Sequence, residues 1–182
     1  MSRASLSHNW GTTREECALP FPDDTAEDAG ADCLYRGVSV AAAPAIVFRW
    51  LCQLRVAPYS YDWIDNRGRQ SPRTLTPGLE ALERGQTFME IFRLEHFVTD
   101  EHVTLVTPTG GRGARLFGHV RVTYWAQRAP AGGTRLLVKL RVHQAPGLWG
   151  RLASALLPSG DLIMMRRQLL NLKARAEASA RG

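Results

Sequence analysis

The stretch between Tyr59 and Arg69 holds the side chains of this chain that are best suited to chemistry. Phenols, carboxylates and a guanidinium follow one another there, and such groups can orient a ligand whose bulk lies against hydrocarbon walls. A carboxyl group that lost its hydration would have a raised pKa and could act as a general acid or base. The simpler interpretation is structural, with aromatic rings closing one end of the fold. The candidates for catalysis are Tyr61, Asp62 and Asp65.

Other signatures of chemistry are missing from the sequence. It has no zinc-protease His-Glu motif, no glycine-rich phosphate loop and no nucleophile elbow. Its histidines show no ligand spacing along the chain, so we predict neither a metal site nor a cofactor. Three cysteines without zinc or redox spacing, no long apolar run and no signal peptide indicate a cytoplasmic protein without an integral membrane segment. The histidines are His8, His96, His102, His119 and His143, and the cysteines are Cys17, Cys33 and Cys52.

Charge is divided unevenly along the chain. The net charge is +6, yet residues 1–34 hold seven acidic and two basic side chains, whereas the remainder is strongly basic. We therefore expect residues 1–33 to form an acidic arm that lies over a basic body, and residues 34–182 to form a single domain. Because no aromatic-basic motif or recognition helix accompanies the basic charge, we predict no nucleic-acid partner.

A long C-terminal helix is the clearest element in the sequence. Between Asp161 and Glu177, apolar residues recur at helical spacing, and the opposite side is rich in arginine. Asp161 is expected to cap this helix or to favour its N-terminus by charge. The apolar stripe consists of Leu162, Met165, Leu169, Leu172 and Ala176.

Strands and short helices are expected ahead of that helix. Alternation is cleanest between Thr134 and Gln144, where one face is apolar and the other basic, as in an antiparallel sheet with one wet face. Pro44 should open a helix that ends near Arg55, and a second short helix is predicted over 78–84. The orientation of Glu90 and Arg93 stays undecided. The predicted strands are 34–40, 87–98, 102–107, 115–125 and 134–144.

One helix cannot cover such a sheet. The helix over 161–177 is about 25 Å long and about 10 Å wide, whereas the five predicted strands, about 4.8 Å apart, span about 24 Å. The sheet must curl around the helix, and only two short helices remain to fill the space. We therefore predict an internal cavity lined by the apolar strand face. The expected ligand contacts are Tyr59, Tyr61, Trp63, Phe92, Val120, Tyr124, Val138, Met165 and Leu169.

Four segments carry a resemblance to a known superfamily: Trp10–Glu16, Ala43–Leu54, Tyr59–Asn66 and Gly160–Leu170. Together they resemble the SRPBCC superfamily, which includes START lipid-transfer domains, the birch pollen allergen and aromatic polyketide cyclases. The resemblance implies an α+β helix-grip fold, in which a curved antiparallel sheet wraps around a long C-terminal helix, with two short helices and a cavity for an apolar ligand. The superfamily shares no catalytic residue set, so none is assigned here.

These observations favour a protein that binds a hydrophobic small molecule, such as a lipid or a polyketide-like compound, for carriage or sensing. One alternative is a cyclase or dehydratase that acts on a polyketide-like substrate by acid-base chemistry. Another is a regulatory protein that docks a partner through its basic face. Since a fold does not determine a function, the sequence leaves open whether the protein is an enzyme, which ligand it takes and its oligomeric state.

Overall fold

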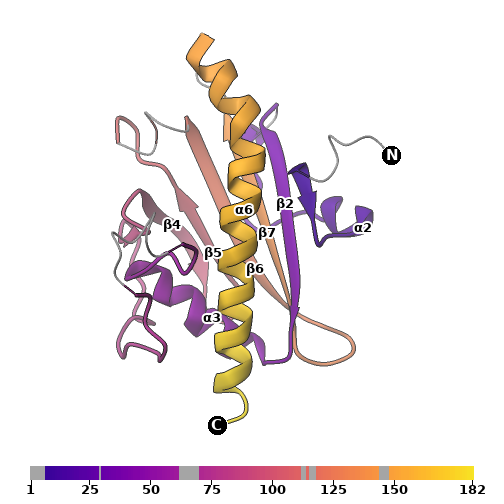
Figure 1. Cartoon of the computed structure of the whole chain (residues 1–182), viewed down its shortest axis with the longest axis vertical. Coiled ribbons are helices and arrows are strands. Elements are labelled where there is room, and N and C mark those ends of the chain that lie inside the picture. The colour runs from indigo at the N-terminus through magenta and orange to yellow at the C-terminus, as the bar shows by residue number, and fades with distance from the viewer. Residues whose placement is uncertain (1–6, 29, 62–69, 112–113, 115–117, 144–147) are drawn as a thin grey trace.

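One sheet and one long helix dominate the computed structural model (Figure 1), which describes residues 7–28, 30–61, 70–111, 114, 118–143 and 148–182. The strand order is β1-β2-β7-β6-β5-β4-β3, and only the β1–β2 pair is parallel. The elements are β1 (Asn9–Trp10), α2 (Arg14–Cys17), η1 (Ala26–Asp28), β2 (Asp32–Val40), α3 (Pro44–Cys52), η2 (Gln53–Arg55), β3 (Thr87–Phe88), β4 (Phe92–Val98), β5 (His102–Val106), β6 (His119–Arg128), β7 (Thr134–His143) and α6 (Leu148–Ser179).

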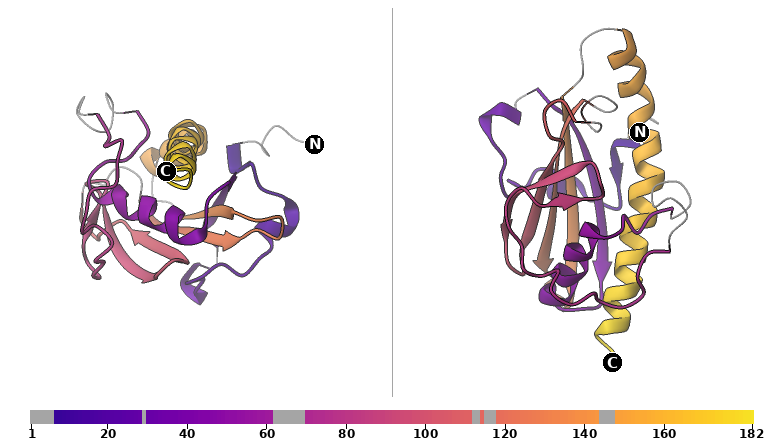
Figure 2. Two further views of the ribbon diagram at one scale, coloured as in Figure 1. Left: turned by 90° about the horizontal axis from the view of Figure 1, so that it is seen from below. Right: turned by 90° about the vertical axis from the view of Figure 1, so that its left-hand side faces the viewer.

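Alternation along the strands gives the sheet two different faces. On β7, Leu136, Val138 and Leu140 are buried on the side that α6 covers, which we call the helix face. Lys139 and Arg141 lie on the opposite side, the outer face, as the period of two requires. The end-on view in Figure 2 places α6 and η1 on opposite sides of the sheet. The predicted half-polar antiparallel sheet is confirmed.

The predicted helix at Pro44 is also confirmed. α3 has proline in its first turn, buries Val47, Trp50 and Leu51, and passes into η2, which ends at Arg55. It packs against the C-terminal part of α6, where the Trp50 indole Nε1 donates a hydrogen bond to Ser179 Oγ at 3.0 Å. α3 therefore covers only one end of the helix face (Figure 1).

Two sequence-based expectations about helices are wrong. α6 starts at Leu148 and continues through Pro158, so Asp161 lies within the helix and does not cap it. Residues 78–84 form turns and loop instead of the predicted helix. Gly78 has a φ of 82°, and Arg55 donates hydrogen bonds to the carbonyl oxygens of Leu79 and Ala81, which in a helix would accept from backbone N–H groups.

The predicted strand over 87–98 is in fact a hairpin. Met89 and Glu90 both have positive φ, at 47° and 62°, and the chain reverses there between β3 and β4. Glu90 is exposed in this turn, and Arg93 is exposed on the outer face, where it contacts the Thr87 hydroxyl. Arg93 is therefore an outer-face residue of β4, and Glu90 belongs to a turn rather than to a strand.

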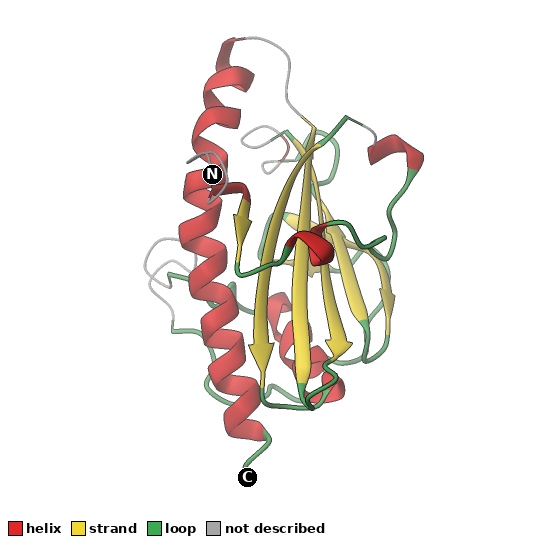
Figure 3. Ribbon diagram, turned by 90° about the vertical axis from the view of Figure 1, so that its right-hand side faces the viewer, coloured by secondary structure: helices red, strands yellow, loops and turns green. Residues whose placement is uncertain are grey.

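The part of the acidic arm from Glu16 to Asp28 lies on the outer face, as the charge asymmetry predicted, whereas β1 joins the sheet beside β2, which already begins at Asp32. The arm's carboxylates pair with basic residues of β6 and β7: Asp24 accepts hydrogen bonds from Lys139 Nζ at 2.9 Å and from Arg141 Nε at 2.8 Å. The Phe21 ring is buried edge-on against Trp125, with ring centroids 5.3 Å apart. Charge and one aromatic anchor therefore hold the arm to the sheet. Figure 3 shows the path of the backbone on this side of the molecule.

Two glycines allow the arm to reach β2 closely. Gly11 has a φ of 71°, and a Cβ atom there would lie 2.1 Å from the Gly37 carbonyl oxygen. A Cβ atom on Gly37 would in turn meet the Thr12 methyl group at 2.9 Å. Only glycine fits this crossing, which places β1 beside β2.

Candidate functional site

The interface between the helix face and α6 gathers five of the side chains predicted to contact a ligand. Val120 and Tyr124 come from β6, Val138 from β7, and Met165 and Leu169 from α6. All five are buried. The sheet register sets Tyr124 directly beside Val138, and the spacing of four sets Met165 and Leu169 on one side of the helix.

Accessible surface on this wall is unevenly distributed. Val138 and Leu169 have an exposed fraction of 0%, whereas Val120 retains 4% and Met165 retains 7%. Val142, which pairs with Val120 across β6 and β7, retains 5%. Leu140 of β7 retains 6% and Val38 of β2 retains 7%, so small accessible areas occur along the length of the wall.

A buried hydrogen-bond chain crosses the interface. The Tyr124 hydroxyl donates to Gln168 Oε1 at 2.8 Å, and Gln168 Nε2 donates to the Pro58 carbonyl oxygen at 2.7 Å. One turn along α6, Asn171 Nδ2 donates to the Tyr59 carbonyl oxygen at 2.8 Å. Burial raises the pKa of Tyr124 far above its usual value, so the phenol stays neutral and acts as a hydrogen-bond donor.

A buried ion pair lies on the same helix face. Arg36 of β2 has no exposed surface, and its Nη2 lies 2.8 Å from Asp161 Oδ2 of α6. The guanidinium also donates to the backbone carbonyls of Ser7 and His8. Burial raises the pKa of Asp161 to about 6, because the loss of hydration has a larger effect than the positive charge of Arg36, which lowers the pKa. Asp161 is therefore a carboxyl group that exchanges its proton near neutral pH.

The raised pKa of Asp161 predicts a specific pH dependence of stability. In the unfolded chain an aspartate titrates at about 3.9, so between that pH and about 6 the folded state holds a proton that the unfolded state has lost. Stability must fall as pH rises through this window, by up to about 3 kcal/mol from this group. Guanidinium unfolding of the wild type and of Asp161→Asn at several pH values measures this loss of stability. The free energy of unfolding of the wild type should fall relative to that of Asp161→Asn by up to about 3 kcal/mol from pH 4 to pH 7, and parallel curves would contradict the shift.

The remaining predicted site residues fall in different places. Tyr59 is buried with its ring edge-on to Trp50, at a centroid distance of 5.9 Å. Phe92 is half-buried and packs against the core, and Tyr61 is half-buried. Three further candidates lie outside the residues that the structure describes, and their proposed roles stay predictions: Asp62, Trp63 and Asp65.

Arg36, Asp161 and Gln168 are site residues that sequence reasoning missed. For each of them, its position within an apolar periodic pattern of the sequence was a signal. Arg36 alternates in phase with Leu34 and Val38 on an otherwise apolar strand face, and Asp161 and Gln168 fall on the stripe of Met165 and its neighbours. A polar residue in phase with a buried apolar series must be paired when it is buried.

The fold is shared with solved structures of low sequence identity. The protein TTHA0849 from Thermus thermophilus matches with a TM-score of 0.53 and 17% identity, over 81% of this chain and 99% of that one. Protein CV1439 from Chromobacterium violaceum matches with a TM-score of 0.51 and 14% identity, over 80% and 96%. The di-domain ARO/CYC StfQ from the steffimycin biosynthetic pathway matches with a TM-score of 0.50 and 11% identity, over 82% of this chain and 52% of its own.

These likenesses show a shared fold and agree with the described architecture: a curved sheet, a long C-terminal helix and short helices make an α+β helix-grip fold. No family model and no curated protein matches the sequence. Within the described part of the chain, no helix is both long and apolar enough to cross a bilayer.

Proposed function

We propose that this protein binds one hydrophobic small molecule, of lipid or polyketide-like character, between the helix face of the sheet and α6. The observation that carries the proposal is the small residual accessible surface of Val120, Val142, Leu140 and Met165 on a buried apolar wall. Hydrocarbon groups line this part of the wall, and the polar groups of Tyr124 and Asp161 lie on the same wall and could orient a guest. The helix-grip likeness to StfQ, which is named as an ARO/CYC, is in keeping with such a guest.

Titration with a neutral naphthylamine dye tests this proposal. The dye should bind saturably with one site per chain, and long-chain fatty acids or polycyclic phenols should displace it. Dye that binds without saturation, or that no lipophile displaces, would contradict an internal site. Native circular dichroism during the titration excludes binding to unfolded chain.

Acid-base catalysis on a polyketide-like substrate is a second candidate, and Asp161 is the observation that favours it. A carboxyl group with a pKa of about 6 is suited to giving and taking protons near neutral pH. Arg36, 2.8 Å away, could stabilise an enolate oxygen that forms nearby. Asp161→Asn should then retain dye binding and lose cyclisation or dehydration of an aromatic polyketide analogue. Equal turnover by wild type and variant would remove the catalytic role.

Partner docking through a basic face loses its support. Several basic side chains of β6 and β7 on the outer face pair with the chain's own acids: Arg135 with Glu16 at 2.7 Å, and Arg121 with Asp28 at 3.3 Å. A partner would have to displace the arm to reach them. We therefore do not propose this function.

A further inference from the structure

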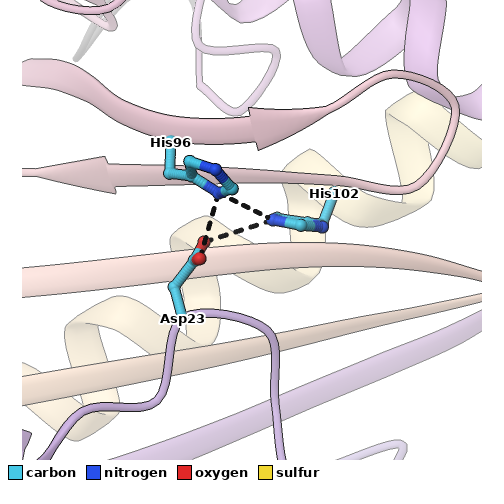
Figure 4. Close-up of side chains that lie close together, drawn as sticks. All are labelled: Asp23, His96 and His102. Carbon is cyan, nitrogen blue, oxygen red and sulfur yellow. Dashed lines mark hydrogen bonds and ion pairs between the residues drawn. The ribbon is translucent and has the colours of Figure 1, made fainter.

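Asp23, His96 and His102 converge on the outer face, on the side of the sheet away from the proposed ligand site (Figure 4). They come from three segments: the arm, β4 and β5. The β4–β5 hairpin brings the two histidines together, with His96 Nδ1 3.3 Å from His102 Nε2. A register shift between Leu94 and His96 lets both Glu95 and His96 lie on the outer face, where Glu95 pairs with Arg121.

The spacing of the three donors suits a metal ion. Asp23 Oδ1 lies 3.0 Å from His96 Nδ1, and Asp23 Oδ2 lies 3.2 Å from His102 Nε2. Zinc bonds to histidine nitrogen and carboxylate oxygen are about 2.0–2.2 Å long, which sets neighbouring ligand atoms of a tetrahedron about 3.3 Å apart. The His96–His102 separation and the two contacts with Asp23, which end on different carboxylate oxygens, lie within a few tenths of an ångström of that value. With one ligand atom from each residue, all three atoms lie within 4.8 Å of one another, so the side chains would close around an ion as it binds.

A supporting group orients one of the three donors. The Thr104 hydroxyl donates to Asp23 Oδ2 at 2.6 Å, which leaves Oδ1 to act as the ligand atom. His102 is nearly fully buried, and its other ring nitrogen, Nδ1, lies 3.5 Å from Glu101 Oε1 without a hydrogen bond. A small movement of Glu101 would place a carboxylate behind this histidine, an arrangement that orients metal-binding histidines.

We propose that Asp23, His96 and His102 bind a divalent first-row transition ion, with zinc the ion that two imidazoles and one carboxylate suit well. Three protein ligands leave further coordination positions, and His96 is about one-third exposed, so water could complete the set. Because Asp23 belongs to the arm and the histidines to the hairpin, the ion would also fasten the arm to the sheet. The spacing of the histidines along the sequence led us to predict no metal site, because it does not show that these three side chains meet in the fold.

Calorimetric titration of the untagged protein with zinc tests the proposal. The wild type should bind one zinc ion per chain with micromolar or tighter affinity. His96→Ala and Asp23→Asn should each weaken binding by at least ~100-fold, since loss of even an outer partner costs about 10–100-fold. Both variants are chosen to keep the fold: His96 is partly exposed, and asparagine tolerates the left-handed backbone of Asp23, whose φ is 62°. Cobalt should give the visible absorption of a tetrahedral site in the wild type only.

A second histidine pair on the same face supplies the control. His119 and His143 are register partners on β6 and β7, with ring centroids 5.8 Å apart, and His143 Nε2 lies 4.0 Å from Asp28 Oδ1. The residue types are the same, but the donors do not converge as closely. His119→Ala should therefore bind zinc as the wild type does. Failure of the wild type to bind, or equal binding by His96→Ala and the wild type, would overturn the proposal and leave a hydrogen-bonded cluster.

Discussion

Val120→Phe should abolish binding of a lipophilic probe, weakening its affinity by ~100-fold or more, while the protein keeps its stability to within about 1 kcal/mol. Val120 lies where the helix face retains accessible surface, so a benzyl group can occupy the space proposed for the guest. A benzyl group that fills the proposed space adds apolar contact without strain. The dye titration gives the affinity, and guanidinium unfolding gives the free energy of unfolding.

Val138→Phe is the matched control for that substitution. Val138 faces the same way from the adjacent strand but has no exposed surface, so the same added group must push its neighbours apart. Overpacking of this kind costs about 1–3 kcal/mol. If Val120→Phe destabilised the protein as much as Val138→Phe does, the wall would be packed throughout, and the proposed site would be lost.

Asp24→Ala should destabilise the protein by about 3 kcal/mol, since it leaves a buried guanidinium without its nearest carboxylate. Arg141 has no exposed surface, and its Nε donates to Asp24 Oδ1 at 2.8 Å. Glu80→Ala removes the partner of Arg49, which is half exposed, and should cost less than about 1 kcal/mol. Equal losses in the two variants, measured by chemical unfolding, would show that the arm is not held by this contact.

The same contact predicts how acid should affect the arm. Burial disfavours the charge of Asp24, but hydrogen bonds from Lys139 and Arg141 outweigh it and lower the pKa of the carboxyl group. A lowered pKa gives stability that is present above the unfolded value of about 4 and is lost as pH falls through the folded value. Asp24→Ala should accordingly lose less stability on acidification than the wild type. An unchanged acid response would refute this assignment.

Residue patterns predicted the parts of the fold in which one physical rule dominates. The period of two over 134–143 fixed the two faces of β7, and the charge asymmetry placed the acidic arm on the basic face. Long-range contacts decided the parts that the patterns missed. Arg55 donates a hydrogen bond to a backbone carbonyl that a helix over 78–84 would need for its own hydrogen bonds. Met89 and Glu90 have positive φ, and the turn they form divides one expected strand into a hairpin.

The candidate site was predicted in its apolar half only. Val120, Tyr124 and Met165 follow from periodicity, because side chains in phase on a strand or helix share one face. The pairing of Arg36 with Asp161 joins residues 125 positions apart, and no local pattern specifies it. The convergence of His96, His102 and Asp23 depends on a hairpin and on a docked arm, so it too becomes visible only in three dimensions.

Native mass spectrometry of the protein mixed with fatty acids and polycyclic phenols of graded length tests the central proposal most directly. We predict a complex with one guest per chain, with a preference for one length or ring number, that Val120→Phe fails to form. Bare protein across the whole series, or a complex that Val120→Phe forms as readily as the wild type, would contradict a hydrophobic guest between the sheet and α6.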